Sequence, residues 1–308
     1  MSILILLFVA SASTAAGARK LLREDSTDHH VVDTNVDIAD RRHKIYLLGN
    51  SVVRHYSFSI VAAFLKLDAD ISRDRAYERD HCGDVLGTNH CSHRVDCGNN
   101  TQIDVSFLWK MYLSKPGDTV GLITDARDVC KDTTKHPLKD ETNENCLTTE
   151  FKDASKSDLL IVQSPAVSYW GSGLVDTFEK FAATYNIDDV EFGSRMLLKA
   201  FPGKILYISF TQLSHIRQPT EPSSGNKTIS ALFTVDKVNN ITCAGVQRLS
   251  AASDNRLEFV DLNDLLLRAN LKLYNDIVHH PGLLSLNASK ILLSKWGVPL
   301  PLSCNTRR

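Results

Sequence analysis

The sequence has almost no excess charge of either sign. Its 35 Lys and Arg residues oppose 36 Asp and Glu residues, which leaves a formal net charge of −1. Proteins that bind nucleic acid usually present excess or clustered positive charge toward the phosphates. The charge balance therefore gives no support for a nucleic-acid partner. With 308 residues, 43% of them hydrophobic, the chain is long enough to bury a sizeable core.

No hydrophobic run at the start of the chain is long enough to cross a bilayer, which takes about 20 apolar residues. The apolar run at residues 3–10 is followed by small residues that include Ala16 and Ala18. This pattern predicts a cleaved secretory signal peptide over residues 1–18, although no positive charge precedes the run. A signal anchor is the alternative. We therefore expect a protein of the secretory-pathway lumen, Golgi included, or a secreted one, without a transmembrane span.

Two further features agree with export. Acceptor sequons for N-linked glycans begin at Asn99, Asn226, Asn240 and Asn287. The chain has seven cysteines, and in an oxidising compartment most of them would form disulfides. The odd cysteine would stay free or pair between chains.

The cysteines lack the C-x2-C spacing of a zinc knuckle. Residues 72–101 contain Cys82, Cys91 and Cys97 with several histidines nearby. Cysteine and histidine are zinc ligands, so a metal-dependent protein built on this segment is one interpretation. The wide spacing instead favours a disulfide-stapled, Cys- and His-rich surface loop inserted into the domain. We expect no metal and no cofactor.

The rest of the chain indicates one α/β domain. Residues 19–42 are polar and charged without sustained periodicity, which predicts a disordered leader before a domain at 43–308. Strands are expected at 44–48, 102–109, 158–163, 204–210 and 257–260, the last strand, and helices at 51–67, 173–201, 262–273 and 281–296. Residues 125–157 and 218–230 are expected to be loops. The alternation predicts a three-layer α/β/α sandwich with a mainly parallel sheet, whose site lies at the carboxyl edge of the strands.

One strand-to-helix junction carries a candidate nucleophile. The apolar residues 45–48 end in Gly49, Asn50 and Ser51, and a helical pattern follows. At a helix N-terminus, the backbone N–H groups of Ser51 and the next residues would point outward and favour developing negative charge. A hydroxyl nucleophile there has half of an oxyanion hole built in. The alternative interpretation is a simple helix cap.

A second candidate stretch lies before the expected last helix. Asp276 and His279 are three positions apart, and Pro281 is suited to the first turn of that helix. In a loop, this spacing can let the carboxylate reach the Nδ1 side of the imidazole, fix its tautomer and stabilise its protonated form. The alternative is a polar turn that caps the helix. His280 is a further candidate for facing Ser51.

Together the two stretches resemble the SGNH/GDSL hydrolase superfamily, in which a Gly-Asp-Ser block carries the nucleophile and a D-x-x-H block carries the Asp and His. The run from Gly49 to Arg54 looks like the G-D-S-x-x-R block of the PC-esterase branch, which includes trichome-birefringence-like polysaccharide O-acetyltransferases. The resemblance implies an SGNH/flavodoxin-like sandwich with Ser51 as nucleophile, His279 as general base and Asp276 as its orienting group. The oxyanion or substrate-contacting candidates are Gly49, Asn50, Arg54 and His280.

The sequence departs from this family at three points. Asn50 stands where the family has Asp, which keeps the shape but loses the charge. A G-x-N-D block, or a Gly-His-Trp variant, should follow a central strand, but the strand at 158–163 ends in Gln163 and continues with Ser164 and Pro165. The glycine of the family's second block cannot be assigned.

The resemblance implies a serine esterase or O-acyltransferase that acts on O-acyl esters, chiefly acetyl esters, of carbohydrate. Ser51 would take the acyl group, and water or a sugar hydroxyl would then remove it. The expected partner is an acylated carbohydrate or glycan. The rival interpretation is a secreted module of the same fold that has lost turnover and binds carbohydrate or protein.

Overall fold

The structure, a computed structural model, describes residues 41–66, 90–97, 101–109, 113, 146–163, 183, 185–209, 225–262, 265, 282–297 and 304–306. The chain divides into two units, Met1–Asp37 and Ile38–Arg308, and every described residue belongs to the second. Among the described residues, no helix is long and apolar enough to span a membrane. The predicted signal peptide and nearly all of the predicted leader lie outside the described residues.

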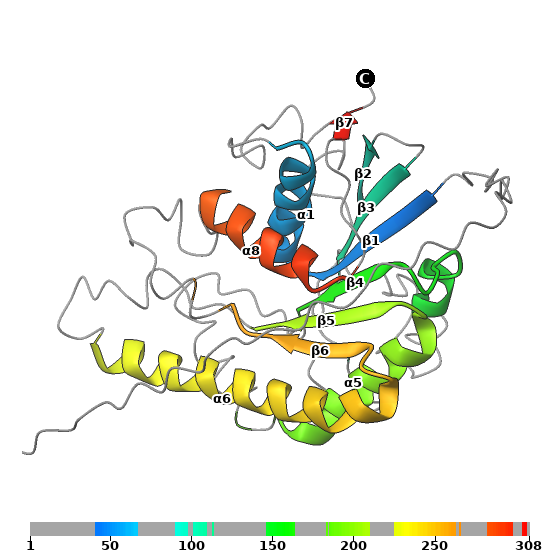
Figure 1. Ribbon diagram of the computed structural model, residues 1–308. Helices are drawn as coiled ribbons and strands as arrows, with labels where there is room; N and C mark the ends of the chain where they lie inside the picture. The colour runs from blue at the N-terminus through cyan, green and yellow to red at the C-terminus, as the bar shows by residue number, and fades with distance from the viewer. Residues whose placement is uncertain are drawn as a thin grey trace, which may run out of the picture. The chain divides into compact units, whose positions relative to one another are not determined.

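A seven-stranded sheet forms the centre of the domain (Figure 1). Its strands lie in the order β6-β5-β4-β1-β3-β2-β7. The strands from β6 to β3 run parallel, and β2 and β7 pair antiparallel at one edge. The strand bounds are Arg41–Gly49 for β1, His90–Cys97 for β2, Thr101–Trp109 for β3, Leu159–Val162 for β4, Lys204–Ile208 for β5, Leu257–Val260 for β6 and Cys304–Thr306 for β7. The predicted mainly parallel sheet is confirmed.

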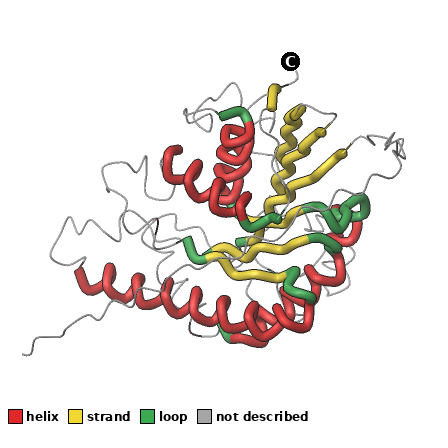
Figure 2. Tube along the Cα trace, in the orientation of Figure 1, coloured by secondary structure: helices red, strands yellow, loops and turns green. Residues whose placement is uncertain are grey.

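Helices cover both faces of the sheet (Figure 2). Among the described residues, the longer helices are α1 at Ser51–Phe64, α5 at Ile187–Ala200, α6 at Gly225–Ser250 and α8 at Gly282–Ser294, with α1 packed on α8 and α5 packed on α6. Successive side chains of a strand point to opposite faces, and β1 shows the two layers. The ring of His43 contacts Trp296, just after α8, whereas Tyr46 contacts Phe151 and Phe201, which follows α5. The expected α/β/α sandwich is therefore confirmed.

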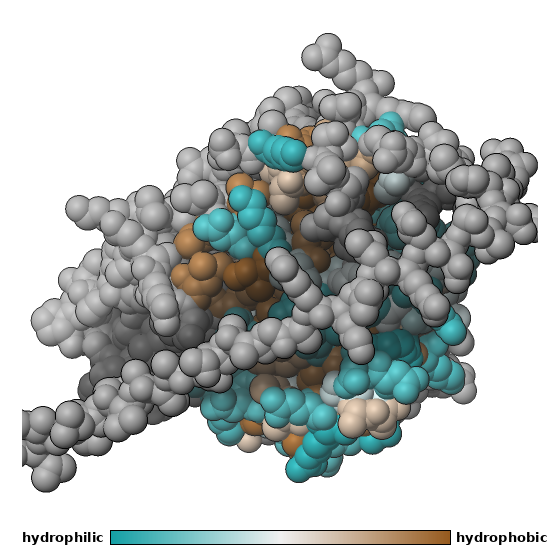
Figure 3. Space-filling model, in the orientation of Figure 1, coloured by the Kyte–Doolittle hydropathy of each residue, from teal (hydrophilic) through white to brown (hydrophobic). Residues whose placement is uncertain are grey.

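The core lies on both sides of the central strands. Every residue of β4 is buried, and Ile45 and Leu47 of β1 are fully buried. Figure 3 shows apolar side chains gathered around α8, whereas the side of α5 and α6 is mostly hydrophilic in this view. Continuous burial of β4 is typical of a parallel strand with helices on both faces.

β2 lies where the sequence predicted an inserted loop, so that prediction is wrong for residues 90–97. Cys91, Val95 and Cys97 are buried, whereas Ser92 and Arg94 between them are exposed. This alternation is the signature of a strand with one solvated face. The polar and histidine content of the segment obscured it in the sequence.

Helices also occupy two segments that were expected to be loops. α6 begins at Gly225, inside the predicted loop 218–230, and residues 146–150 are helical inside the predicted loop 125–157. The buried residues Val235, Val238, Val246 and Leu249 show the spacing of one helical face. Asn, Thr and Gly residues between them are weak helix formers, and they hid the period.

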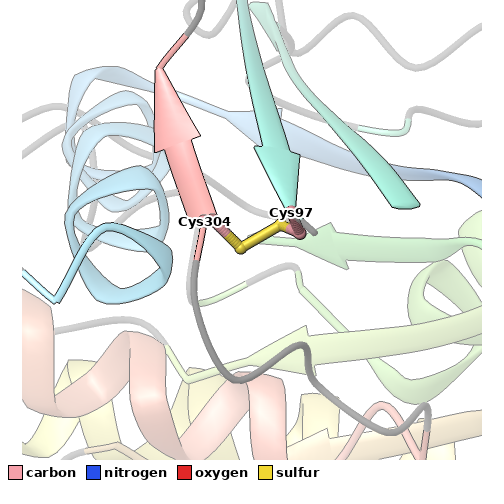
Figure 4. Close-up of a disulfide and its surroundings, with 2 residues drawn as sticks. All are labelled: Cys97 and Cys304. Carbon is pink, nitrogen blue, oxygen red and sulfur yellow. A yellow bond between two sulfur atoms is a disulfide. The ribbon is translucent and has the colours of Figure 1, made fainter. Parts of the chain in front are cut away.

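A disulfide fixes the end of the chain to the sheet. Cys97, the last residue of β2, is bonded to Cys304, the first residue of β7, across 207 positions of sequence (Figure 4). β6 is therefore not the last strand. The three residues of β7 are too few to show a sequence pattern, and their pairing depends on β2. Cys91 and Cys146 each also take part in a disulfide. Cys243 on α6 is a free thiol.

Candidate active site

Ser51 lies where the strand order of the sheet reverses. From β1 the chain passes through α1 to β2 and β3 on one side of β1, and the later strands β4, β5 and β6 lie on the other side. In open α/β sheets, ligands bind at the carboxyl ends of the strands beside this switch point. Ser51 follows directly after β1 and begins α1. The predicted position of Ser51 at the carboxyl edge of the sheet is thus found.

Gly49 allows α1 to begin this close to β1. A Cβ atom added at Gly49 would lie 2.5 Å from Cγ2 of Val53, on the first turn of α1. Real Cβ contacts are longer than this, so any larger residue would push the first turn away from the strand. The structure gives Gly49 a steric role in placing Ser51.

Asn50 caps the helix and occupies one of its N–H groups. The Asn50 backbone is extended, and its side-chain oxygen accepts a hydrogen bond from the backbone N–H of Val52 at 2.9 Å. Val52 was among the residues expected to offer an outward N–H group, and for Val52 that expectation is wrong. The short amide side chain of an N-cap satisfies the N–H two residues on. The cap does not engage the N–H of Ser51 itself, which lies next to the Ser51 hydroxyl.

The hydroxyl and the backbone N–H of Ser51 are available to bind a substrate. The residue is 9% exposed. Within the described part of the chain, neither its hydroxyl nor its backbone N–H makes a hydrogen bond to another residue. Ser51 thus presents a hydroxyl and an N–H group from the same helix N-terminus, as a nucleophile with its own oxyanion donor requires.

Arg54 and His55 belong to the packing of α1. Arg54 is 7% exposed, its N–H bonds the carbonyl of Asn50, and its carbonyl accepts the Ser57 hydroxyl at 2.6 Å. The half-buried His55 places its ring edge-on to Phe58, with 6.2 Å between the centroids. The burial of Arg54 fits the interpretation that its stem covers apolar surface.

α8 begins on the carboxyl side of the sheet. Trp296, two residues beyond the end of α8, contacts His43 near the start of β1 and donates Nε1 to the carbonyl of Ser157, just before β4, at 3.0 Å. The C-terminus of α8 therefore lies at the amino-terminal edge of the sheet. From there the helix extends about 20 Å back, since each residue adds about 1.5 Å. In Figure 1 its first turn lies on the side toward which β1, β4 and β5 point.

Asp276, His279 and His280 lie outside the described residues, so their distances to Ser51 stay predictions. Of the sequons, Asn240 is exposed on α6 and Asn287 is half-buried on α8. The side chains of Asn99 and Asn226 are not described.

Sequence reasoning missed a row of hydrogen bonds along the carboxyl edge. Gln163, just after β4, donates its N–H to the carbonyl of Leu48 at 3.0 Å and its Nε2 to the carbonyl of Ser209 at 3.1 Å. Ser209, just after β5, donates its N–H to Val260 at 3.1 Å, and its hydroxyl accepts the N–H of Leu262 at 2.9 Å. The available signal was a polar residue, Gln163 or Ser209, directly after each of two buried strands.

The described residues do not support a metal centre on the Cys- and His-rich segment. No group of three His, Cys, Asp or Glu side chains in the described ranges is arranged to hold a metal ion. Cys91 and Cys97 are disulfide-bonded. A sulfur in a disulfide has no thiolate to offer zinc, so neither residue is a ligand.

No family model matches the chain, and no curated protein matches it in sequence. Solved structures similar to it include the following two. Est24, a carbohydrate acetylesterase from Sinorhizobium meliloti, has 10% identity and a TM-score of 0.37, over 83% of this chain and 98% of that one. An extracellular lipase from Streptomyces rimosus has 10% identity and a TM-score of 0.35, over 80% and 99%. Similarity at this level does not identify a relative, and the fold rests on the sheet topology described above.

Proposed function

We propose that the protein is a serine esterase or O-acyltransferase with Ser51 as its nucleophile. One observation carries the proposal. A buried central strand ends at the switch point of a parallel sheet, and the first helical residue after it is a serine whose hydroxyl and N–H are both uncommitted within the described chain. This arrangement suits attack on a carbonyl group whose oxygen becomes negative.

The chemistry consists of two acyl transfers. The Ser51 oxygen attacks the ester carbonyl carbon while His279 takes the hydroxyl proton, and the N–H of Ser51 stabilises the resulting oxyanion. His279 then gives the proton to the leaving alcohol oxygen as the ester C–O bond breaks, which leaves an acyl-serine. Water or a sugar hydroxyl then attacks the acyl-serine carbonyl carbon and loses its proton to His279. His279 returns this proton to the Ser51 oxygen as the acyl–serine C–O bond breaks, which releases the free acid or the acylated sugar. Asp276 orients the imidazole and stabilises its charged form.

The reach of the chain supports this assignment of His279. α8 begins at Gly282 on the carboxyl side of the sheet, the side on which Ser51 begins α1. Three residues span at most about 11 Å. A link this short to α8 is compatible with the proposed position of His279 beside Ser51.

The proposed substrate is an O-acetyl ester of a carbohydrate. This part of the proposal rests on the resemblance of residues 49–54 to the PC-esterase block. The export signals agree with it, because a secreted or Golgi-lumenal protein meets glycans.

A second function, a binding module without turnover, is favoured by two hydrogen bonds near Ser51. Asn50 occupies the N–H of Val52, and the side-chain amide of Gln163 donates to Ser209. Two donors at the site edge thus already have intramolecular partners. Loss of oxyanion donors lowers turnover by about 10²–10³-fold each in serine hydrolases.

Labelling with a fluorophosphonate separates the two functions. We expect the secreted protein to be modified at Ser51, shown by peptide mapping, and to release acetate from an acetylated oligosaccharide. Ser51→Ala should abolish both, and Ser59→Ala, a matched change further along α1, should abolish neither. Labelling elsewhere in the chain, or acetate release that survives Ser51→Ala, would contradict the assignment of Ser51. Glycan binding without labelling or acetate release would favour the binding module.

A further inference from the structure

The row of hydrogen bonds at the carboxyl edge is made by two deeply buried polar residues. Gln163 is 2% exposed and Ser209 is 0% exposed. Burial of an amide or hydroxyl costs free energy unless the group is hydrogen-bonded. Two apolar side chains would fill this space without needing such partners. The row, hereafter the edge clamp, joins the ends of β1, β4, β5 and β6 through Gln163 and Ser209.

One end of the edge clamp lies three residues before the proposed nucleophile, and the other lies where the chain leaves β6. At one end, Gln163 bonds the carbonyl of Leu48, three residues before Ser51. At the other end, the Ser209 hydroxyl accepts the N–H of Leu262, two residues beyond β6, where the regular sheet ladder has ended. Leu262 begins the stretch of chain that leads to Asp276 and His279.

Only a side chain can direct the chain at this point. The N–H of Ser209 continues the ladder by bonding Val260, and its hydroxyl then substitutes for the missing ladder partner of Leu262. Leu262 is fully buried, so its N–H would otherwise lack water. The hydroxyl thus sets the direction in which the chain leaves β6.

We propose that Gln163 and Ser209 are positioning residues, which hold Asp261 and Leu262, the segment just after β6, in place against the carboxyl ends of β5, β4 and β1, the strand that leads to Ser51. The inference rests on the proposed function, because its consequence is measured at the proposed nucleophile, Ser51. It predicts that loss of the clamp loosens this segment and slows the reaction at Ser51 without removing the nucleophile.

The variants are Ser209→Ala and Gln163→Met, each of which removes one side-chain hydrogen bond and keeps the backbone bonds. The control is Ser253→Ala, which removes the hydroxyl of a residue that is 6% exposed; this hydroxyl donates to the carbonyl of Ser250, the last residue of α6. Two measurements apply to each protein: amide hydrogen exchange of peptides that cover 261–265, and the rate of fluorophosphonate labelling at Ser51 across pH.

We expect both clamp variants to exchange faster at 261–265 than the control and to label about tenfold more slowly, with an altered pH profile. The control should lose only thermal stability. Exchange at 261–265 that matches the control would overturn the clamp, whatever the labelling shows. Faster exchange with an unchanged labelling rate would overturn its role in the reaction. If the unmodified protein is not labelled at all, the proposed function fails, and the exchange measurement still decides whether the clamp orders the segment.

Discussion

The side chain of Asn50 accepts a hydrogen bond from the backbone N–H of Val52 at 2.9 Å, and Ser51 lies between these two residues. The cap therefore holds the backbone on both sides of the proposed nucleophile. It also leaves the N–H of Ser51 as the donor nearest to the hydroxyl. One small polar residue thus fixes the start of α1 and limits the number of donors available to an oxyanion.

Asn50→Ala should destabilise the protein by about 1 kcal/mol, because the N–H of Val52 loses its partner at a buried helix end. Urea unfolding measures this change. Asn186→Ala, which removes the cap of α5 by the same chemistry, is the matched control for stability. Only Asn50→Ala should also lower ester turnover, because only this cap fixes the backbone on both sides of Ser51, and we expect the loss of that order to outweigh the donor it frees at Val52. Equal turnover in the two variants would show that the Asn50 cap is structural alone.

Gly49→Ala should cost about 1–3 kcal/mol of stability, because the new methyl group meets the side chain of Val53 and forces α1 outward. Thermal unfolding gives the stability, and fluorophosphonate labelling gives the reactivity of Ser51. Val53→Ala in the same chain removes the clash at the cost of a cavity. If Gly49→Ala were as stable as the unmodified protein, the close approach of α1 to β1 would be wrong.

Ser51→Ala and His279→Ala should each abolish ester turnover to a similar extent, and the double variant should lose little more, because members of a triad act as a unit. Asp276→Asn should cost somewhat less and leave the fold intact. The rate of acetyl-ester turnover is measured for all four variants. If His280→Ala rather than His279→Ala removes activity, the adjacent histidine is the base.

Denatured, non-reduced protein should contain about one free thiol per chain, and peptide mapping should place it at Cys243. Burial raises the pKa of this thiol, and the charge of Asp261 adds to the effect, so alkylation of the folded protein near pH 7 should be slow. Cys243→Ser is the control and should remove the labelled peptide. Replacement of Cys97 and Cys304 by Ala should cost about 2–5 kcal/mol of stability. Finding most of the seven thiols free would contradict an oxidising compartment.

Part of the stability should be lost in acid through Asp104. Burial raises the pKa of this carboxyl, but hydrogen bonds from Arg94 at 2.8 Å and Arg42 at 2.6 Å outweigh it, so the pKa lies below its ordinary value. A lowered pKa stabilises the fold above the pKa of the unfolded chain, about 3.9, and this contribution is lost as the pH falls through the folded value.

Asp104→Asn should therefore lower stability by about 1–2 kcal/mol at pH 7, since both arginines are half exposed, and flatten its decline below pH 4. Urea unfolding between pH 3 and pH 7 measures this dependence. Glu191→Gln, which breaks an exposed pair with Arg195, is the control and should change the profile less. An unchanged acid limb in Asp104→Asn would contradict the role of this carboxyl.

The sequence by itself determined the local elements whose causes are local. The apolar residues 45–48, Gly49 and Asn50 predict a buried strand, a tight turn and a capped helix start, and the structure has all three at Ser51. The strand at Leu257–Val260 was predicted with the same bounds, and α8 within two residues at each end. Hydrophobic period and helix-start chemistry act over a few residues and can be read from one segment.

Tertiary structure decided whatever depends on partners distant in sequence. β2 pairs with β3 and β7, and the three residues of β7 form a strand only through their pairing with β2, to which Cys304 is also bonded through Cys97. Gln163 and Ser209 gained a role only when their strand ends became neighbours. A sequence pattern records the preference of a residue for burial or turn, whereas pairing across the sheet depends on contacts that no single segment contains.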